Sequence, residues 1–115
     1  MYRWILLSLA AILAAQQVGT NKTNTVLRGT IDIHVHSDPD SRPRSIDALD
    51  VAKLARSKGM RGIVLKNHYD PTGGLAYLVR KEVSGLEVFG GIDLNLTVGR
   101  INPATMAHIA KISKK

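Results

Sequence analysis

Two histidines, His34 and His36, are separated by a single residue in the apolar segment 31–36, which reads IDIHVH. Side chains alternate between the two faces of a β-strand, so residues i and i+2 point the same way. In a strand, Asp32, His34 and His36 are therefore predicted to share one face. A face that carries a carboxylate and two imidazoles is costly to bury unless these groups bind something.

The spacing of the two imidazoles is that of a metal site. Two ring nitrogens on one strand face can bind the same divalent ion, and we expect zinc first, with manganese, iron, cobalt or nickel as alternatives. Such ligands need an acceptor for the second ring nitrogen. Asp38 or Asp32 is expected to supply that acceptor or a third ligand. The alternative is that His34 and His36 are structural residues joined by hydrogen bonds.

Further polar groups follow the second apolar segment. Lys66 and His68 lie two residues apart, so a strand would place them on one face, where we expect them to contact a metal or a substrate. A lysine there can also act as a base with a shifted pKa, bind an anion, or extend its ammonium group to solvent. Asn67 and Asn95 are expected to cap loops. His108 is expected to be a surface or packing residue.

An alternation of strands and helices is predicted to position these groups. The expected elements are a strand at 30–36, a helix from the N-cap Ser45 to Gly59, a strand at 61–68, a helix at 75–83, a strand at 87–96 and a helix that starts at Asn102-Pro103. This order predicts the α/β class, with parallel strands joined by right-handed crossovers. The strands are apolar on both faces, which predicts burial on both. Active sites lie at the carboxyl ends of the strands in parallel α/β barrels.

The first residues do not fit this pattern. Arg3 precedes the apolar run 4–15, which is shorter than the 20 or so residues of a membrane span and is typical of a secretory signal. We therefore predict a signal peptide at 1–20, a polar linker at 21–28 and one domain at 29–115. The expected product is exported to the periplasm or secreted, without a stable membrane span. If the apolar run is not a signal, the chain is cytoplasmic.

Composition excludes some functions. The 115 residues carry a net charge of +7, but the basic residues are scattered and aromatic residues make up only 4%. A nucleic-acid interface would need clustered basic residues interleaved with aromatic ones. We predict a small-molecule substrate and no nucleic-acid partner. The chain has no cysteine and therefore no disulfide.

Three segments taken together, IDIHVHSDPD, GMRGIVLKNHYDPT and EVFGGIDLNLTVGRINP, resemble the start of the amidohydrolase superfamily of metal-dependent hydrolases, in an uncharacterised branch. The resemblance implies a TIM-type (β/α)8 barrel in which water activated by one or two divalent ions hydrolyses amide or ester bonds. It implies that His34 and His36 are metal ligands. The other ligands of the superfamily come from later strands, and Lys66 lies too early to correspond to its carboxylated lysine.

Two alternatives remain open. The segment HVHSDPD also resembles the polymerase-and-histidinol-phosphatase (PHP) family of metal-dependent phosphoesterases, which has Thr-Asp-His at its second strand. The triplet Lys66-Asn67-His68 lacks the acidic residue, which would leave His34, His36 and His68 as ligands. The second alternative is a non-catalytic binding module.

The length of the predicted domain limits each of these interpretations. A (β/α)8 barrel needs at least about 200 residues, whereas the predicted strands and helices make up three β/α units. We therefore predict that 29–115 is the incomplete N-terminal part of a TIM-type barrel. Such a fragment is expected to bind metal weakly and to be inactive alone.

Overall fold

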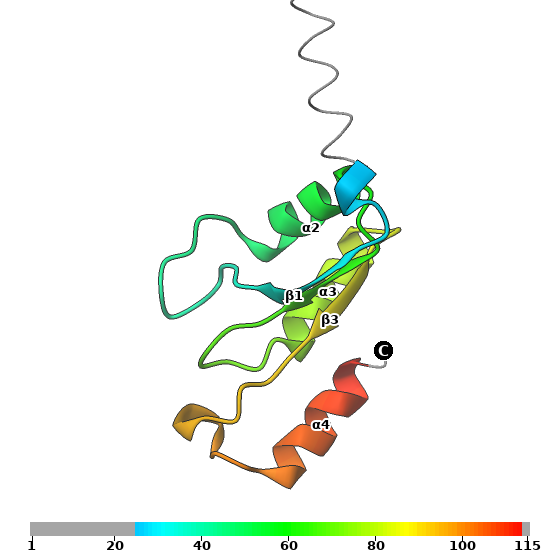
Figure 1. The fold of residues 1–115 in the computed structure, drawn as a ribbon. Coiled ribbons are helices and arrows are strands. Elements are labelled where there is room, and N and C mark those ends of the chain that lie inside the picture. Colours follow the sequence, from blue (N-terminus) through cyan, green and yellow to red (C-terminus); the bar gives the residue numbers. More distant parts are fainter. Residues whose placement is uncertain (1–24, 114–115) are drawn as a thin grey trace, which may run out of the picture.

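The computed structural model describes residues 25–113. They form an α/β structure with a three-stranded parallel sheet in the order β1-β2-β3 (Figure 1). The elements are β1 (Ile31–Val35), α2 (Ala48–Ser57), β2 (Gly62–Leu65), α3 (Gly73–Glu82), β3 (Glu87–Gly90), the short 3₁₀ helix η1 (Leu96–Val98) and α4 (Pro103–Ser113). The α/β class and the parallel strands predicted from the sequence are confirmed.

The predicted signal at 1–20 lies outside the described residues, as does the start of the predicted linker. Within that linker, residues 25–27 form a helical turn. The chain then joins the domain where Gly29 N donates a hydrogen bond of 2.8 Å to Gly59 O. None of the helices in the described part of the chain is long and apolar enough to cross a membrane.

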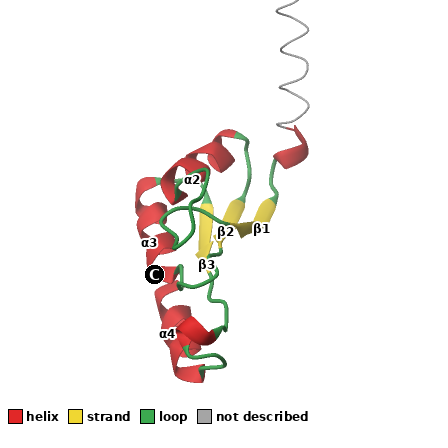
Figure 2. Cartoon of the chain, turned by 90° about the vertical axis from the view of Figure 1, so that its left-hand side faces the viewer, coloured by secondary structure: helices red, strands yellow, loops and turns green. Residues whose placement is uncertain are grey.

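All the long helices lie on one side of the sheet (Figure 2). Helices α2 and α3 pack on the strands, and α4 packs against α3. The core between them consists of small and branched aliphatic side chains: Val35, Ala48, Ala52, Ala55, Ile63, Leu65, Ala76, Val79, Val83, Leu86 and Val88. Alanines on both helices allow the helix axes to approach the sheet closely.

The opposite face of the sheet is uncovered in the described structure. Ile33 of β1 is 75% exposed and Phe89 of β3 is 41% exposed. Strand β2 is the most buried of the three because it is the central strand, although Val64 on its uncovered face is only half-buried. The prediction of burial on both faces is therefore wrong for β1 and β3.

Helix α2 begins at a different cap from the predicted one. Asp47, and not Ser45, is the N-cap, and its carboxylate accepts a hydrogen bond of 2.8 Å from Asp50 N. Both residue types cap helices well. The choice is made by tertiary contacts, since Asp38 N donates to Ile46 O and Ala48 N donates to Asp38 O, both at 3.0 Å.

Helix α3 and strand β3 also differ from their predicted bounds. Helix α3 starts at Gly73, before the predicted residue 75, and β3 ends at Gly90 instead of 96. One buried hydroxyl accounts for both changes. Thr72 Oγ1 donates to Leu65 O at 2.5 Å and accepts from Gly91 N at 2.8 Å, so the start of α3 is fixed against the ends of β2 and β3.

The contact between β3 and α3 generates a stability prediction. A Cβ atom on Gly90 would lie 2.5 Å from Gly73 Cα and 2.6 Å from Gly73 N, which are backbone atoms that cannot rotate away. We expect Gly90→Ala to lower the free energy of unfolding by about 1–3 kcal/mol, the usual range for overpacking. Urea denaturation followed by circular dichroism measures this.

Gly74→Ala is the matched control. A Cβ atom at Gly74 meets no atom within 4 Å, and the residue lies in the first turn of α3. Alanine there is expected to raise the free energy of unfolding by about 0.5–1 kcal/mol, because it reduces the backbone freedom of the unfolded chain. Equal effects of the two substitutions would contradict the close approach of β3 to α3.

Candidate functional site

His34, in β1, and His36, directly after it, point to the same place. Their Nε2 atoms are 3.0 Å apart and share a hydrogen bond, and the two rings meet edge to face with their centroids 4.9 Å apart. Val35, between them, is buried in the helix-side core. The imidazoles therefore lie on the uncovered side of the sheet, at the carboxyl end of β1.

Asp32 does not share their face, contrary to the prediction. Asp32 pairs with Ile63 and Val35 pairs with Leu65. Two residues of β1 between these pairs therefore lie opposite one residue of β2, and the register shifts. This irregularity places Asp32 on the helix side of the sheet, beside Val35. Its carboxylate accepts a hydrogen bond of 2.9 Å from the backbone N of His34.

His68 joins the pair from the neighbouring strand. It follows β2, and its ring stacks on that of His36 with the centroids 4.6 Å apart and the planes 29° apart. The carboxyl ends of parallel strands meet at one edge of a sheet, which brings residues far apart in the sequence together here. Three of the four histidines of the chain thus form one row, which we call the histidine cluster: His34, His36 and His68.

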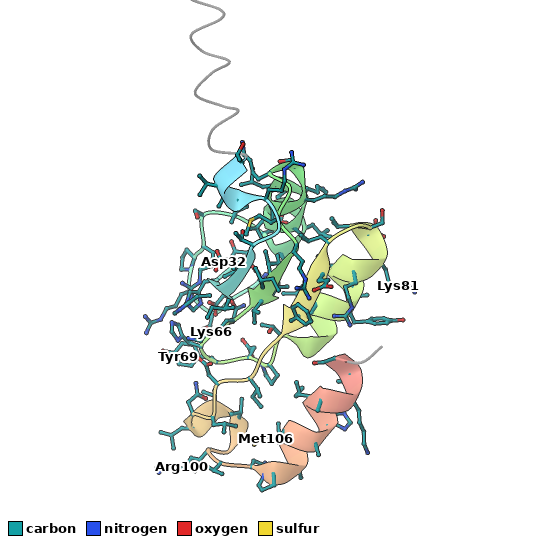
Figure 3. All side chains as sticks on the ribbon, turned by 45° about the vertical axis from the view of Figure 1, so that its right-hand side comes forward. Asp32, Lys66, Tyr69, Lys81, Arg100 and Met106 are labelled. Atoms are coloured by element: carbon teal, nitrogen blue, oxygen red, sulfur yellow. The ribbon has the colours of Figure 1, made fainter. Side chains whose placement is uncertain are left out.

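Asp93 is a member of the site that the sequence reasoning did not select. Its Oδ2 lies 3.6 Å from His68 Nδ1 and 3.9 Å from Lys66 Nζ. Lys66, also at the carboxyl end of β2, lies near Tyr69 (Figure 3). The signal for Asp93 was its position near the carboxyl end of the third predicted strand, 87–96, because polar residues also gather at the carboxyl ends of the other two predicted strands.

Asp38 makes backbone contacts in the loop between β1 and α2. In the described part of the chain its carboxylate forms no hydrogen bond with the histidine cluster. Nδ1 of His36 is buried and has no hydrogen-bond partner among the described residues. The expected acceptor for the second nitrogen of a ligating histidine is thus not provided by Asp38 or Asp32 here.

The electrostatic surroundings keep His36 neutral. Burial lowers the pKa of His36 below its ordinary value of 6.5, and electrostatic interactions with Arg44, His68, His34 and Lys66 lower it further, in that order. A neutral imidazole is the form that binds a metal ion. His36 is therefore in the required form at neutral pH.

Two asparagines hold the loops around the cluster, as predicted. The buried amide of Asn67 accepts from Ser37 N at 3.4 Å and donates to Ser37 O at 3.2 Å and to Pro39 O at 3.0 Å. Asn95 donates to His68 O and caps η1 through a hydrogen bond from Thr97 N. These bonds join the loops that follow all three strands. His108 is exposed on α4, far along the chain from the cluster.

The geometry of the pair fits a shared ion. Zinc binds imidazole nitrogen at about 2.0–2.1 Å, so two Nε2 atoms 3.0 Å apart can both reach one ion. As they stand, residues 25–113 contain no group of three or more His, Asp or Glu side chains placed to hold a metal. The pair supplies two ligands, and His68 is the nearest further imidazole.

The fold and the cluster define a small parallel α/β domain with a row of histidines at the carboxyl edge of its sheet. Residues 29–115 match a family of unknown function (DUF6282), and the chain belongs to that family. Neither the curated proteins nor the solved structures contain a match to the chain.

A buried ion pair orders the loop beside His36. Asp40 Oδ2 accepts hydrogen bonds from Arg44 Nε at 2.7 Å and from Arg44 Nη2 at 2.5 Å, and the carboxylate side chain of Asp40 is fully buried. The hydrogen bond from Arg44 is the main reason why the pKa of Asp40 lies below its ordinary value of 3.8. Because the folded pKa is lower than the unfolded one, this pair stabilises the fold above the unfolded pKa. The stabilisation is lost as the pH falls through the folded pKa.

We expect Asp40→Asn to lower the melting temperature at pH 7, and the difference from the wild type to shrink as the pH falls below about 4. Thermal melts between pH 7 and pH 2.5 measure this. Asp50→Asn is the control, since Asp50 forms an exposed pair with Lys53 and such pairs contribute little. A difference that stays constant down to pH 2.5 would show that the Asp40 charge does not stabilise the fold.

Proposed function

We propose that this domain carries the first metal ligands of a metal-dependent hydrolase of the amidohydrolase type, which cleaves amide or ester bonds of a small molecule. His34 and His36 hold a divalent ion, with zinc first and manganese, iron, cobalt or nickel as alternatives. The observation that carries the proposal is the 3.0 Å separation of the two Nε2 atoms at the carboxyl end of a parallel strand.

The residues around the pair support this role. Burial and the neighbouring cations keep His36 neutral, as a ligand must be. Asp93 Oδ2 lies 3.6 Å from His68 Nδ1 and 3.9 Å from Lys66 Nζ, so a carboxylate stands beside that ring nitrogen, as the second nitrogen of a ligating histidine requires. When bound, the metal supplies an activated water and polarises the bond to be cleaved.

The described sheet supports the finer fold proposal, that these elements are the first three β/α units of a (β/α)8 barrel. Strands β1 and β3 each have an edge unpaired in the described sheet, and the face away from the helices exposes Ile33 and Phe89. Parallel sheets of this type are normally covered on both faces. In this proposal, later strands supply the remaining ligands and the general base, and the segment 1–20 directs export.

A PHP-type phosphoesterase is the second candidate. Positive charge favours it, because Arg44 and Lys66 both lie close enough to His36 to lower the pKa of its ring. A phosphoryl group carries more negative charge than an amide or an ester. The missing acidic residue before His68 weakens this candidate, because Asn67 is a loop-holding amide in the structure.

Metal titration of the purified chain, by calorimetry and by metal analysis after dialysis, tests the proposal. We expect one divalent ion per chain, and we expect His34→Ala with His36→Ala to weaken binding at least about 100-fold. Loss of a partner outside the ligand set already costs about 10–100-fold in affinity.

His108→Ala is the matched control, because it removes an exposed imidazole of the same chain on α4. Circular dichroism of each variant shows that the fold is kept. Equal metal binding by the wild type and the double variant would overturn the proposal. So would an equal loss in His108→Ala, since it would show that any surface histidine contributes.

A further inference from the structure

Arg42 is held beside the candidate site by a neutral partner. It lies in the loop between β1 and α2, and its Nη2 donates a hydrogen bond of 2.9 Å to Tyr69 Oη in the loop after β2. Its guanidinium carbon lies 5.5 Å from the centre of the Tyr69 ring. This contact joins the same two loops as the hydrogen bonds of Asn67.

The other cations near the site have carboxylate partners. Arg44 pairs with Asp40, and Lys66 faces Asp93. Within residues 25–113, Arg42 forms no ion pair, and the exposed Asp70 that follows Tyr69 does not pair with it. The fixed charge of Arg42 is therefore available to a ligand, while its side chain is oriented by the phenol.

Tyr69 connects Arg42 to the histidine cluster. Its ring centroid is 6.2 Å from that of His68, which in turn stacks on His36. The backbone on both sides is fixed, since Thr97 Oγ1 donates to Tyr69 O at 2.9 Å and Asn95 donates to His68 O. Tyr69 therefore links the guanidinium of Arg42 to the imidazoles.

We propose that Arg42, oriented by Tyr69, binds an oxyanion of the small-molecule substrate, either a carboxylate or a phosphate, next to the histidine cluster. A guanidinium carries five N–H donors, and the contact with Tyr69 uses one of them. The remaining donors can bind two oxygens of a carboxylate or phosphate side by side. The inference rests on the proposed function for the identity of the site, whereas the anion contact does not involve the metal.

The positive surroundings of the cluster agree with an anionic ligand. Arg44 and Lys66, the other cations beside the cluster, face the carboxylates of Asp40 and Asp93. Arg42 has no carboxylate partner among the described residues, so its charge adds a net attraction for an anion. Attraction of this kind also raises the rate of association at low salt.

The test is a titration of the metal-free chain with inorganic phosphate and, separately, with acetate, followed by nuclear magnetic resonance at constant ionic strength. We expect Arg42→Gln to weaken binding at least about tenfold, because it removes a charged hydrogen-bond donor. Arg42→Lys keeps the positive charge but loses the parallel N–H donors of the guanidinium. Its affinity should therefore lie between those of the wild type and of Arg42→Gln. Tyr69→Phe removes the orienting hydroxyl and should weaken binding severalfold without loss of the fold.

Arg56→Gln is the matched control, because Arg56 is an exposed arginine in the last turn of α2. Whichever of phosphate and acetate binds the wild type more tightly identifies the class of oxyanion, and either result supports the proposal. Equal binding by the wild type and Arg42→Gln, or an equal loss in Arg56→Gln, would overturn it. The metal titration above separates the two proposals: if metal binds as expected and the anion result fails, only the oxyanion site is wrong.

Discussion

Strand β2 pairs in parallel with both of its neighbours, so the residues that follow all three strands meet at one edge of the sheet. The register with β3 runs without interruption from Gly62 opposite Glu87 to Leu65 opposite Gly90. Beyond Leu65, hydrogen bonds from side chains replace the strand ladder. Asn67 binds the loop after β1, and Thr72 binds the ends of β2 and β3. The histidine cluster depends on these two buried polar groups, because the rings come from different strands.

Much of the fold could be predicted because its signals are local. Apolar periodicity and turn residues give the alternation of strands and helices, which is enough to define a parallel α/β domain. The first and last residues of the helices and strands could not be predicted in the same way, because long-range contacts decide them. Ser45 and Asp47 are both good helix caps, and the loop contacts of Asp38 select Asp47. Likewise the alternation of apolar residues continues past Gly90, but β3 ends there because the Thr72 hydroxyl accepts the hydrogen bond of Gly91 N.

The residues of the site also divide into those placed by local sequence and those placed by long-range contacts. His34 and His36 lie side by side because they are residues i and i+2 of an extended segment, so their common direction could be predicted. Asp32 precedes the register shift, and no feature of the sequence marks the shift. Asp93 meets His68 only because β3 is the neighbour of β2, which is a property of the sheet order. A contact between residues of neighbouring strands can be predicted only once the order of the strands in the sheet is known.

The uncovered face of the sheet and the histidine cluster lie on the same side. Val64 pairs with Phe89 on the face opposite Ile63 and Leu65, and Lys66 continues that face toward His68. Any element that covers Ile33 and Phe89 therefore also removes water from the imidazoles. Exclusion of water strengthens each electrostatic interaction in the cluster and raises the cost of a buried nitrogen without a partner, such as His36 Nδ1. Burial of the apolar side chains on this face and the surroundings of the histidine cluster are thus physically coupled, because one covering element would change both.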